Sequence, residues 1–440
     1  MANIKNILKT VVEIGNAKVK VLIGELYDNG TKVRVLGYGE VQSEGIKKSR
    51  IENPEMLKKI VQMAVEKAKN QIEYQIDDVV LGMSSVNTRS KTINKKINFQ
   101  ETEIGEEHIE KLFREAAEEV LKSGEKILKK ELYNIRVNNS GIVRNPLGMI
   151  GKEIQGDIHF ICIDEFELNT YEEVINRSGF QVEKVFLNSV GSAEAVLDTE
   201  EKEKGVALID IGEGITDILI FKNSKLIYSK SIPLGAMHYI NDLAYILEIS
   251  KTEAIEVLNK FEEHKENQKD FLISSGRKFT ISHIRNIIDA RTGDITKFII
   301  ETIEESGFNG YLGRGVVLTG GVSLIDELIE KIISQTGYRV TSKLPPALRG
   351  MENVNPSMSS IVGIFLESLK DELSKIEKKN IEKKEEKEGL INNNSMTADK
   401  NKEDSKESLS KDKEFILEEN KQELKKNVFS QIFDWLSNYI

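Results

Sequence analysis

The chain has 440 residues, of which 30% are charged, and a formal net charge of −10. This balance excludes a general nucleic-acid binder, because such proteins need a basic surface, and the length predicts two lobes with separate cores. Cys162 is the only cysteine, which excludes a disulfide framework within the chain and a cysteine-based zinc site. No stretch reaches the roughly 18 apolar residues of a membrane-spanning helix, and residues 1–10 lack the apolar core of a signal peptide. We therefore expect a protein that is made and kept inside the cell.

Residues 11–25 have the pattern of two strands joined by a turn. The turn contains Gly15 and Asn16, with Glu13 before it and Lys18 after it. Lys18 is a candidate partner for a phosphate group, and the alternative is an exposed strand lysine. Further turns are expected at 28–30 and 37–39, and Pro54 opens a helix whose apolar residues recur at helical spacing.

Residues 83–162 have the character of an inserted unit. They combine strand-like segments with a helix over about 106–123 and a loop of sequence Gly141-Ile-Val-Arg-Asn-Pro-Leu-Gly-Met-Ile-Gly151. A buried strand is expected at 157–163 and a helix at about 170–178. A second helix begins at Asn188 and includes Ser192-Ala-Glu-Ala-Val-Leu197.

Residues 205–221, around which the chain is organised, predict two apolar strands folded back on a glycine-rich turn. Gly212 and Gly214 are expected to adopt positive φ and to bring backbone N–H groups close to an anion. Asp210, at the end of the first strand, is then placed to face a phosphate-bound Mg²⁺, because this ion takes one or two carboxylates and leaves its other positions to phosphate and water. The alternative is an ordinary β-hairpin.

Two later segments complete the pattern. Residues 315–323 predict a strand that ends in Gly320 and Gly321 before a helix, and Gly235 follows the central hairpin. Regular helices are expected at 281–291 and from about 355. Together, the three glycine turns with nearby carboxylates predict a phosphate-binding cleft between the lobes.

The order of these motifs resembles the actin/Hsp70/sugar-kinase superfamily. Its elements are Glu-Ile-Gly with a nearby Lys early, Asp-Ile-Gly-x-Gly-x-Thr-Asp in the middle, and Leu-Thr-Gly-Gly late. The loop at 141–151 and the segment at 192–197 are similar to those of the bacterial division family FtsA. The resemblance covers about residues 11–369 and implies an α/β, actin-like two-lobed ATPase fold with an FtsA-type inserted subdomain, a disordered tether and a C-terminal amphipathic helix.

The resemblance also implies domain boundaries. The first-lobe nucleotide-binding subdomain spans 9–82, completed by 163–197 and 355–370, and the inserted subdomain spans 83–162. The second-lobe nucleotide-binding subdomain spans 198–240 with 309–354, and the second-lobe outer subdomain spans 241–308. A disordered charged linker at 371–426 and an amphipathic membrane helix at 427–440 are expected after the two lobes.

By the same resemblance, the cleft binds ATP and Mg²⁺. Asp210 and, through water, Glu13 are the expected metal-side carboxylates, and the helix near Glu253 is expected to help the Gly-Gly turn hold the base and ribose. The full set of expected nucleotide-binding residues is Glu13, Gly15, Asn16, Lys18, Asp210, Gly212, Gly214, Thr216, Gly235, Glu253, Gly320 and Gly321.

Several departures from the family pattern weaken the case for hydrolysis. Glu13 replaces the usual Asp, and its longer arm shifts the cation or the attacking water. Asn16 and Ala17 stand where the family usually has hydroxyl residues. Glu213 and Ile215 replace the usual Gly and Thr, and Asn188 stands roughly where the family tends to have Glu. We therefore expect ATP binding with weak or no ATPase activity and assign no catalytic residue.

The resemblance implies the partners of a division protein: itself in filaments, the C-terminal peptide of the tubulin-like protein FtsZ, and later division proteins, at the cytoplasmic face of the cell membrane and the division septum. Within 241–308, the candidate peptide-binding residues are Arg285, Arg291 and Lys297, beside the apolar stripe Ile284, Ile287 and Ile288. The alternative is a solvated helix face.

The C-terminal residues 427–440 have apolar residues at the spacing of one helical face. A helix of this length rises about 21 Å at 1.5 Å per residue, less than the ~30 Å hydrocarbon core, so we expect it to lie on the bilayer. The expected membrane-contacting residues are Phe429, Ile432, Phe433, Trp435, Leu436 and Tyr439. The alternative is a helix that docks on the protein's own lobe or in a partner's groove.

Two enzyme or chaperone alternatives share the fold. A sugar or small-metabolite kinase needs an acidic general base in the cleft and gains nothing from a tether with an amphipathic end. An Hsp70-like chaperone needs a β-rich peptide-binding domain after the ATPase core, which the charged C-terminal region does not supply.

Overall fold

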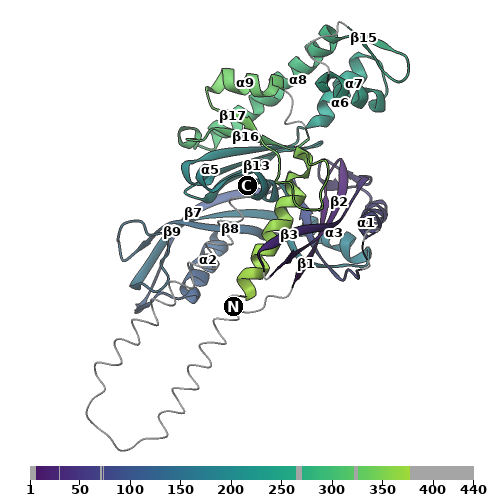
Figure 1. The fold of residues 1–440 in the computed structure, drawn as a ribbon. Helices are drawn as coiled ribbons and strands as arrows, with labels where there is room; N and C mark the ends of the chain where they lie inside the picture. Colours follow the sequence, from purple (N-terminus) through teal and green to yellow (C-terminus); the bar gives the residue numbers. More distant parts are fainter. Residues whose placement is uncertain are drawn as a thin grey trace, which may run out of the picture.

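The computed structural model describes residues 6–28, 30–69, 72, 74–263, 270–321 and 326–376. The chain forms two lobes built on five-stranded sheets, a three-stranded unit beside them, and a group of helices at the far end of the second lobe (Figure 1). The α/β class and the two-lobed architecture predicted from the sequence are thereby confirmed.

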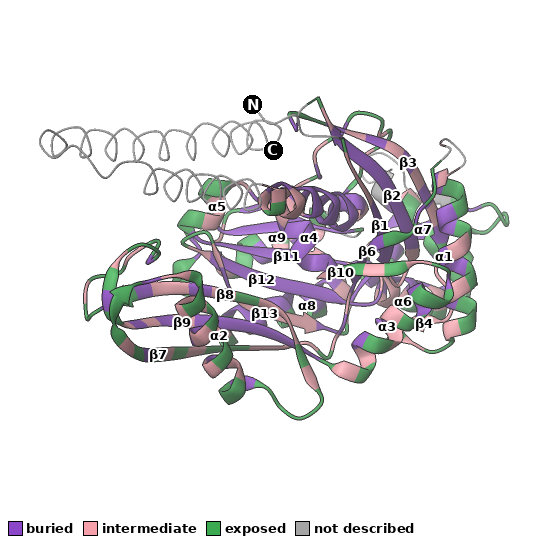
Figure 2. Cartoon of the chain, turned by 90° about the horizontal axis from the view of Figure 1, so that it is seen from below, coloured by how far each residue is buried: buried purple, intermediate pink, exposed green. Residues whose placement is uncertain are grey.

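The two central sheets share one topology. Each has three antiparallel strands, and two parallel strands continue the sheet beyond the first of them. Strands in the middle of the sheets are almost completely buried, whereas the outer faces of the surrounding helices are exposed (Figure 2). The strands of the first sheet are β1 (Ile7–Ile14), β2 (Lys18–Tyr27), β3 (Lys32–Gln42), β6 (Asp78–Met83) and β10 (Gln181–Leu187). Those of the second are β11 (Val206–Ile211), β12 (Thr216–Lys222), β13 (Lys225–Ile232), β16 (Val316–Thr319) and β17 (Val340–Ser342).

Helix α1 (Pro54–Lys69) packs on the first sheet, and every apolar residue of its predicted face is buried. The turn expected at 37–39 is wrong, because Gly37 and Gly39 lie inside β3. A Cβ on Gly37 would lie 2.1 Å from the carbonyl oxygen of Ala68, and one on Gly39 would lie 2.3 Å from that of Ala64. These glycines therefore serve close approach of helix to strand. The short hairpin of β4 (Ile46–Lys47) and β5 (Arg50–Ile51) joins β3 to α1.

The inserted unit is a three-stranded antiparallel sheet with one helix. Its strand order is β7-β9-β8, and α2 packs on one face through Leu112 and Ala116 against Ile154 and Ile158. The Cys162 side chain is buried in the same cluster. The elements are β7 (Arg89–Glu103), α2 (Glu106–Val120), β8 (Glu125–Val137) and β9 (Ile150–Asp164).

Two helices join the lobes. Helix α4 (Asn188–Val196) crosses the helix at 359–376 so closely that a Cβ on Gly363 would lie 1.7 Å from the carbonyl oxygen of Gly191. Their apolar side chains share one core with residues of both central sheets. Helix α3 (Glu165–Arg177) lies on the first lobe, and α5 (Thr199–Lys204) leads into β11.

The outer part of the second lobe is mainly helical. Ile284, Ile287 and Ile288 of α8 are buried in the core of the second lobe. The apolar stripe predicted beside the basic residues is therefore not a surface for a partner. The elements are α6 (Ala236–Ile246), α7 (Lys251–Glu263), β14 (Asp270–Leu272), β15 (Lys278–Thr280) and α8 (Ile281–Glu305), followed by η1 (Asn309–Tyr311), α9 (Asp326–Thr336) and η2 (Pro356–Met358).

The last described helix runs to residue 376, so the linker expected from residue 371 begins too early. Leu373 is buried on the same helical face as Leu366 and Leu369, and Asp371 forms an ion pair with Lys184 of β10. The remaining predicted linker, 377–426, and the predicted membrane helix, 427–440, lie outside the described residues. Within the described part of the chain, no helix combines the length and apolarity needed to cross a bilayer.

Candidate functional site

The first and central glycine turns meet between the lobes. A Cβ on Gly214 would lie 2.9 Å from the Asn16 Cγ, so any larger residue at this contact would displace the Asn16 side chain. The Asn16 amide is fixed by two hydrogen bonds with Ser49: its Nδ2 donates to Oγ at 3.0 Å and its Oδ1 accepts from the backbone N–H at 2.7 Å. The turns predicted to form a cleft are thus adjacent in space.

A buried ion pair lies at the first turn. Both Glu13 carboxylate oxygens are 3.2 Å from the Lys20 Nζ, and both side chains are less than 10% exposed. Lys20 also donates to the carbonyl oxygen of Ser357 at 2.5 Å and so ties the first turn to the final helical segment. The sequence interpretation missed Lys20, although its position opposite Glu13 in the antiparallel pair of β1 and β2 follows from a hairpin closed by the predicted turn.

Asp210, at the end of β11, is the second carboxylate of the cleft. Burial raises its pKa and the charge of Glu13 raises it further, whereas a hydrogen bond of 2.5 Å from the Ser192 hydroxyl lowers it. Gly320 lies against this carboxylate, since a Cβ there would be 2.5 Å from Asp210 Oδ1. Residues from both lobes and from the third glycine turn therefore converge on Asp210.

The expected positive φ at Gly212 and Gly214 is wrong. Neither residue adopts it, whereas Gly320 has φ +91°. Space explains Gly214, because Asn16 occupies the site of a side chain there, whereas a Cβ on Gly212 would make a tight contact of 3.3 Å with the Ile215 carbonyl oxygen. Backbone conformation explains Gly320, where an L-residue would be strained.

These residues fit a magnesium-bound phosphate. A divalent cation would relieve the repulsion between the carboxylates of Glu13 and Asp210, and Mg²⁺ needs only one or two such ligands besides phosphate and water. Asn188 adds a buried Oδ1 that accepts no hydrogen bond within the described residues, while its Nδ2 donates to the Ile14 carbonyl at 3.2 Å. The Asn188 Oδ1 lies against Gly82, since a Cβ there would be 2.7 Å from it, so the junction of the lobes holds a carboxylate pair with an unsatisfied acceptor buried nearby.

Other predicted site residues already have partners. Lys18 is ion-paired with Glu40, and both are about two-fifths exposed. The buried Thr216 hydroxyl donates to the Leu234 carbonyl at 2.8 Å. At the start of α6, the site of a side chain on Gly235 is filled by the carbonyl oxygens of Gly212 and Glu213. Any contact of Lys18 or Thr216 with a nucleotide would thus compete with an existing bond.

The remaining predicted nucleotide-binding residues differ in whether they leave room for a ligand. The Glu253 carboxylate accepts hydrogen bonds at the start of α7, and those from Ser275 and Ser250 lower its pKa to about 2. Gly15 is held in its turn by a bond from its N–H to the Lys18 carbonyl. Gly321 is exposed, and a Cβ there would meet no atom of the described residues within 4 Å. Gly321 therefore leaves room for a ligand, whereas Glu253 acts as a helix cap.

Asp217 is a carboxylate that the sequence interpretation did not select. It lies opposite Asp210 in the β11–β12 pair and accepts a hydrogen bond from Ser231. Burial raises its pKa to about 7, and the charge of Asp210 contributes. It lines a small cavity between the lobes together with first-lobe residues Ser84 and Ser85.

The predicted peptide-binding cations are unequal. Arg291 clamps α8 to α6 through Asp242, with Nε to Oδ2 at 2.6 Å and Nη2 to Oδ1 at 3.0 Å. Lys297 is exposed and lies 3.8 Å from Glu301, and the Arg285 guanidinium lies 5.9 Å from the centroid of the Phe261 ring. Arg291 therefore has a structural role. Of the other two candidates, Lys297 is exposed and Arg285 is half-buried, as Arg291 is.

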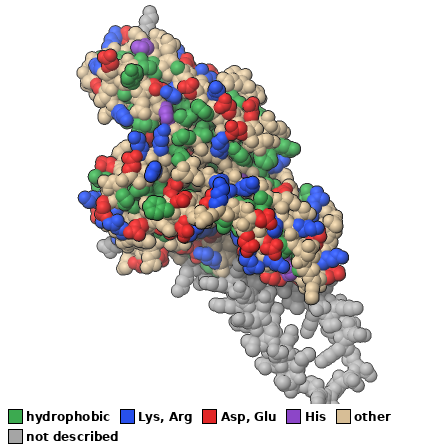
Figure 3. Space-filling view, turned by 180° about the vertical axis from the view of Figure 1, so that it is seen from behind, with side chains coloured by type: hydrophobic (Ala, Val, Ile, Leu, Met, Phe, Trp, Pro, Cys, Tyr) green, Lys and Arg blue, Asp and Glu red, His purple; other side chains and the backbone are tan. Residues whose placement is uncertain are grey.

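The surface charge is mixed. On the face in Figure 3, lysine and arginine alternate with acidic side chains over both lobes, without a continuous basic stripe. This face offers no obvious track for a nucleic-acid backbone.

Two family models match the chain. The one described as "Cell division protein FtsA" matches residues 207–363, and the one described as "SHS2 domain inserted in FTSA" matches 86–162. The first contains the central hairpin and the late Gly-Gly turn, and the second contains the inserted sheet.

Relatives called "Cell division protein FtsA" extend the match. The Pseudomonas aeruginosa protein is 26% identical over 369 residues, covering 81% of this chain and 88% of the relative. The Borreliella burgdorferi protein is 26% identical over 395 residues, covering 84% and 94%. The similarity thus spans both lobes.

Solved structures give the fold. A PilM–PilN type IV pilus biogenesis complex matches with a TM-score of 0.60 at 13% identity, over 82% of this chain and 99% of that one. MreB5 of Spiroplasma citri bound to ADP matches with a TM-score of 0.50 at 15% identity, over 85% and 98%. The actin-like fold predicted from the motifs is confirmed.

Proposed function

Because the chain belongs to the FtsA family of cell-division proteins, we propose that it binds Mg-ATP between its lobes, self-assembles, and attaches FtsZ filaments to the inner face of the cytoplasmic membrane at the septum, where it recruits later division proteins. The observation that carries the nucleotide part is the convergence of Glu13, Asp210 and Gly320 from three separate turns.

In this proposal, Asp210 and Glu13 hold the magnesium side of the nucleotide. Mg²⁺ neutralises phosphate charge and orients the phosphates. Lys20 neutralises Glu13 and keeps its carboxylate buried beside β2, while the exposed Gly321 allows the nucleotide to pass over the third turn. The MreB5 structure named above contains ADP, which supports a nucleotide in a fold of this kind.

Hydrolysis is proposed to be slow. Glu13 is engaged with Lys20, and Asn188 presents an amide in place of a carboxylate that could act as a base. The kinase alternative requires such a base facing a substrate hydroxyl. Each of the three carboxylates between the lobes already has a partner, because Glu13 is paired with Lys20, Asp210 is bonded to Ser192 and Asp217 is bonded to Ser231. The protein is therefore proposed to use ATP binding mainly to control assembly.

Membrane attachment is assigned to residues 427–440. Phe429, Phe433 and Trp435 supply aromatic rings of the kind that sit at the headgroup boundary. One short helix binds reversibly, and assembly of the heads multiplies the attachment through effective concentration. Upstream Lys421, Lys425 and Lys426 each contribute roughly 1 kcal/mol on anionic lipid.

Co-sedimentation with anionic liposomes and Mg-ATP tests this proposal. The full chain is expected to sediment with lipid and to form assemblies there, whereas deletion of 427–440, or Phe433→Asp with Trp435→Asp, leaves a soluble protein that still binds ATP. Ser430→Asp with Ser437→Asp is the matched control, because it adds the same charge on the polar face. Lipid binding retained in the deletion variant would refute the anchor.

A further inference from the structure

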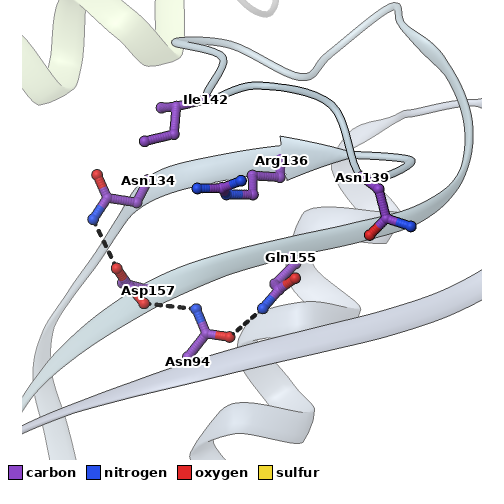
Figure 4. A pocket seen from close by; sticks show the side chains of 7 residues that line it. All are labelled: Asn94, Asn134, Arg136, Asn139, Ile142, Gln155 and Asp157. Atoms are coloured by element: carbon purple, nitrogen blue, oxygen red, sulfur yellow. Dashed lines mark hydrogen bonds between the residues drawn. The ribbon is translucent and has the colours of Figure 1, made fainter.

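The inserted sheet carries a recess on the face opposite α2. The recess measures about 460 Å³, which lies within the range of small-ligand sites. Alternation along β9 places Ile154 and Ile158 under α2 and Gln155 and Asp157 on the other face. The lining side chains are shown in Figure 4, and they are Asn94, Asn134, Arg136, Asn139, Ile142, Gln155 and Asp157.

Asp157, in the floor of the recess, is satisfied by neutral donors. Asn94 Nδ2 donates to its Oδ1 at 2.6 Å, and Asn134 Nδ2 donates to its Oδ2 at 2.7 Å. Gln155 Nε2 in turn donates to Asn94 Oδ1 at 2.5 Å. The carboxylate is therefore bonded by amide groups, and no cation pairs with it among the residues that the structure describes.

A bulge in the edge strand aims Asn134 at this carboxylate. The register of β8 against β9 shifts between Tyr133 and Arg136, and Asn134 has φ +52°. Such bulges redirect side chains at the edges of sheets. In this conformation the Asn134 amide bonds to Asp157, so this carboxylate does not need Arg136 as its partner.

Arg136 is exposed, and its guanidinium has no hydrogen bond or ion pair with any of the residues that the structure describes, although its backbone pairs with Gln155 of β9. Figure 4 shows its side chain between Asn134 and Asn139, over the floor of the recess. A guanidinium presents donors in a fork that matches a carboxylate. The recess thus offers an uncommitted cation among amide groups that can bond to a peptide backbone.

One edge of the recess is apolar. The loop after β8 folds back so that Val143 N–H donates to the Ile135 carbonyl at 2.8 Å, and the neighbouring Ile142 remains 60% exposed. This loop is the Gly- and Pro-rich segment noted in the sequence. Neither the proposed nucleotide site nor the proposed membrane helix includes this loop.

We propose that this recess binds an extended segment of a partner protein in which an Asp or Glu is next to an apolar residue. The acidic side chain pairs with the Arg136 guanidinium, the amides of Asn134, Asn139 and Gln155 bond to the segment's backbone, and the apolar side chain packs on Ile142.

The fixed charge of Asp157 favours a carboxylate over a phosphate. A phosphate dianion is repelled about twice as strongly as a carboxylate by the same negative charge. Ile142 also offers nothing to a free inorganic anion. Charge complementarity and the apolar edge both support an acidic peptide as the occupant.

The test selects a displayed library of random heptapeptides on the full chain, with an Arg136→Ala variant for counter-selection. Enriched sequences are expected to contain Asp or Glu beside an apolar residue, and replacing that acid by Asn or Gln should weaken binding about tenfold. Arg136→Ala should cause a similar loss. Arg144→Ala is the matched control, since this loop arginine is 96% exposed and lies outside the recess.

Asp157→Asn is a variant in which peptide binding should increase, an effect that misfolding cannot produce. Removal of the fixed negative charge should tighten binding of the selected peptides severalfold. The proposal is overturned if no peptide is enriched, if enriched peptides bind Arg136→Ala as well as the parent, or if their amide counterparts bind equally. Displacement of the peptide by inorganic phosphate at similar concentration would also overturn it, because the site would then be a general anion site.

Discussion

The interlobe cleft and the recess on the inserted sheet are both polar, but they are built in different ways. In the cleft, turns that are each contiguous in sequence bring Glu13, Asp210 and Gly320 together, and glycines are required by space or by φ. In the recess, Asn94, Asn134 and Asp157 come from three strands and meet only through register and a bulge. The first kind of site leaves a motif in the sequence, and the second does not.

The two sites also treat buried charge differently. The cleft places carboxylates where burial raises their pKa, which suits a site that receives a cation. The recess surrounds Asp157 with amides and leaves its cation, Arg136, uncommitted. The contrast matches the two proposals, in which the cleft receives a cation and the recess receives an anion.

Breaking the buried ion pair should have the largest effect. Lys20→Met leaves Glu13 buried without a partner, and we expect a loss of about 3–5 kcal/mol in the free energy of unfolding. Glu13→Gln with Lys20→Met should recover most of it. Urea unfolding of both variants measures the difference, and a single variant as stable as the parent would show that the pair does not hold the first turn.

A change at His159 tests the inserted subdomain by the same measurement, the free energy of unfolding. Burial lowers the pKa of His159 to about 4, so the folded state binds fewer protons than the unfolded state between about pH 4 and 6.5. The contribution of His159 to the free energy of unfolding is fully present above pH 6.5 and falls by about 3 kcal/mol as the pH drops to 4.

Comparison with a variant isolates this contribution. His159→Asn should show a flatter stability profile from pH 6.5 to 4 than the parent, whereas the exposed His283→Asn should follow the parent. Parallel profiles for the parent and His159→Asn would contradict the assignment. Urea midpoints at several pH values supply the measurement.

Substitutions at two adjacent glycines, Gly320 and Gly321, test the role of the third turn. Gly320→Ala forces a side chain into positive φ and against Asp210, and should cost about 2 kcal/mol of stability without nucleotide. Gly321→Ala should leave the nucleotide-free protein unchanged, since no atom of the described residues lies within 4 Å, but should weaken ATP binding if the nucleotide passes over it. Thermal unfolding with and without ATP separates these effects.

The outer subdomain should give the smallest effect. Arg285→Glu with Lys297→Glu is expected to weaken binding of an FtsZ C-terminal peptide about fivefold, or roughly 1 kcal/mol, because both cations are near the surface. Lys47→Glu, an exposed site on the first lobe, is the control. Arg291 is unsuitable, since its loss breaks the clamp to Asp242. Equal affinities in fluorescence anisotropy would remove these residues from the site.

The sequence predicted the elements with strong local patterns. The face of α1, the central hairpin and the order of the three turns follow from periodicity and glycine placement. It failed where a contact distant in sequence decides the outcome: Gly37 and Gly39 receive α1, and Leu373 extends the final helix. It made no prediction for Asn134, whose amide bonds to Asp157 at a bulge in β8. Lys20 was missed because two lysines, 18 and 20, compete for one role, and only pairing with Glu13 distinguishes them.

Magnesium-dependent ATP binding tests the central claim most directly. By titration calorimetry, the full chain should bind ATP at least about tenfold more tightly with Mg²⁺ than with a chelator, and Asp210→Asn should abolish that difference. Glu213→Gln, which alters a half-buried carboxylate on the same turn, should retain it. An Asp210→Asn variant with the parent's magnesium dependence, or a parent with none, would contradict the assignment of the cleft.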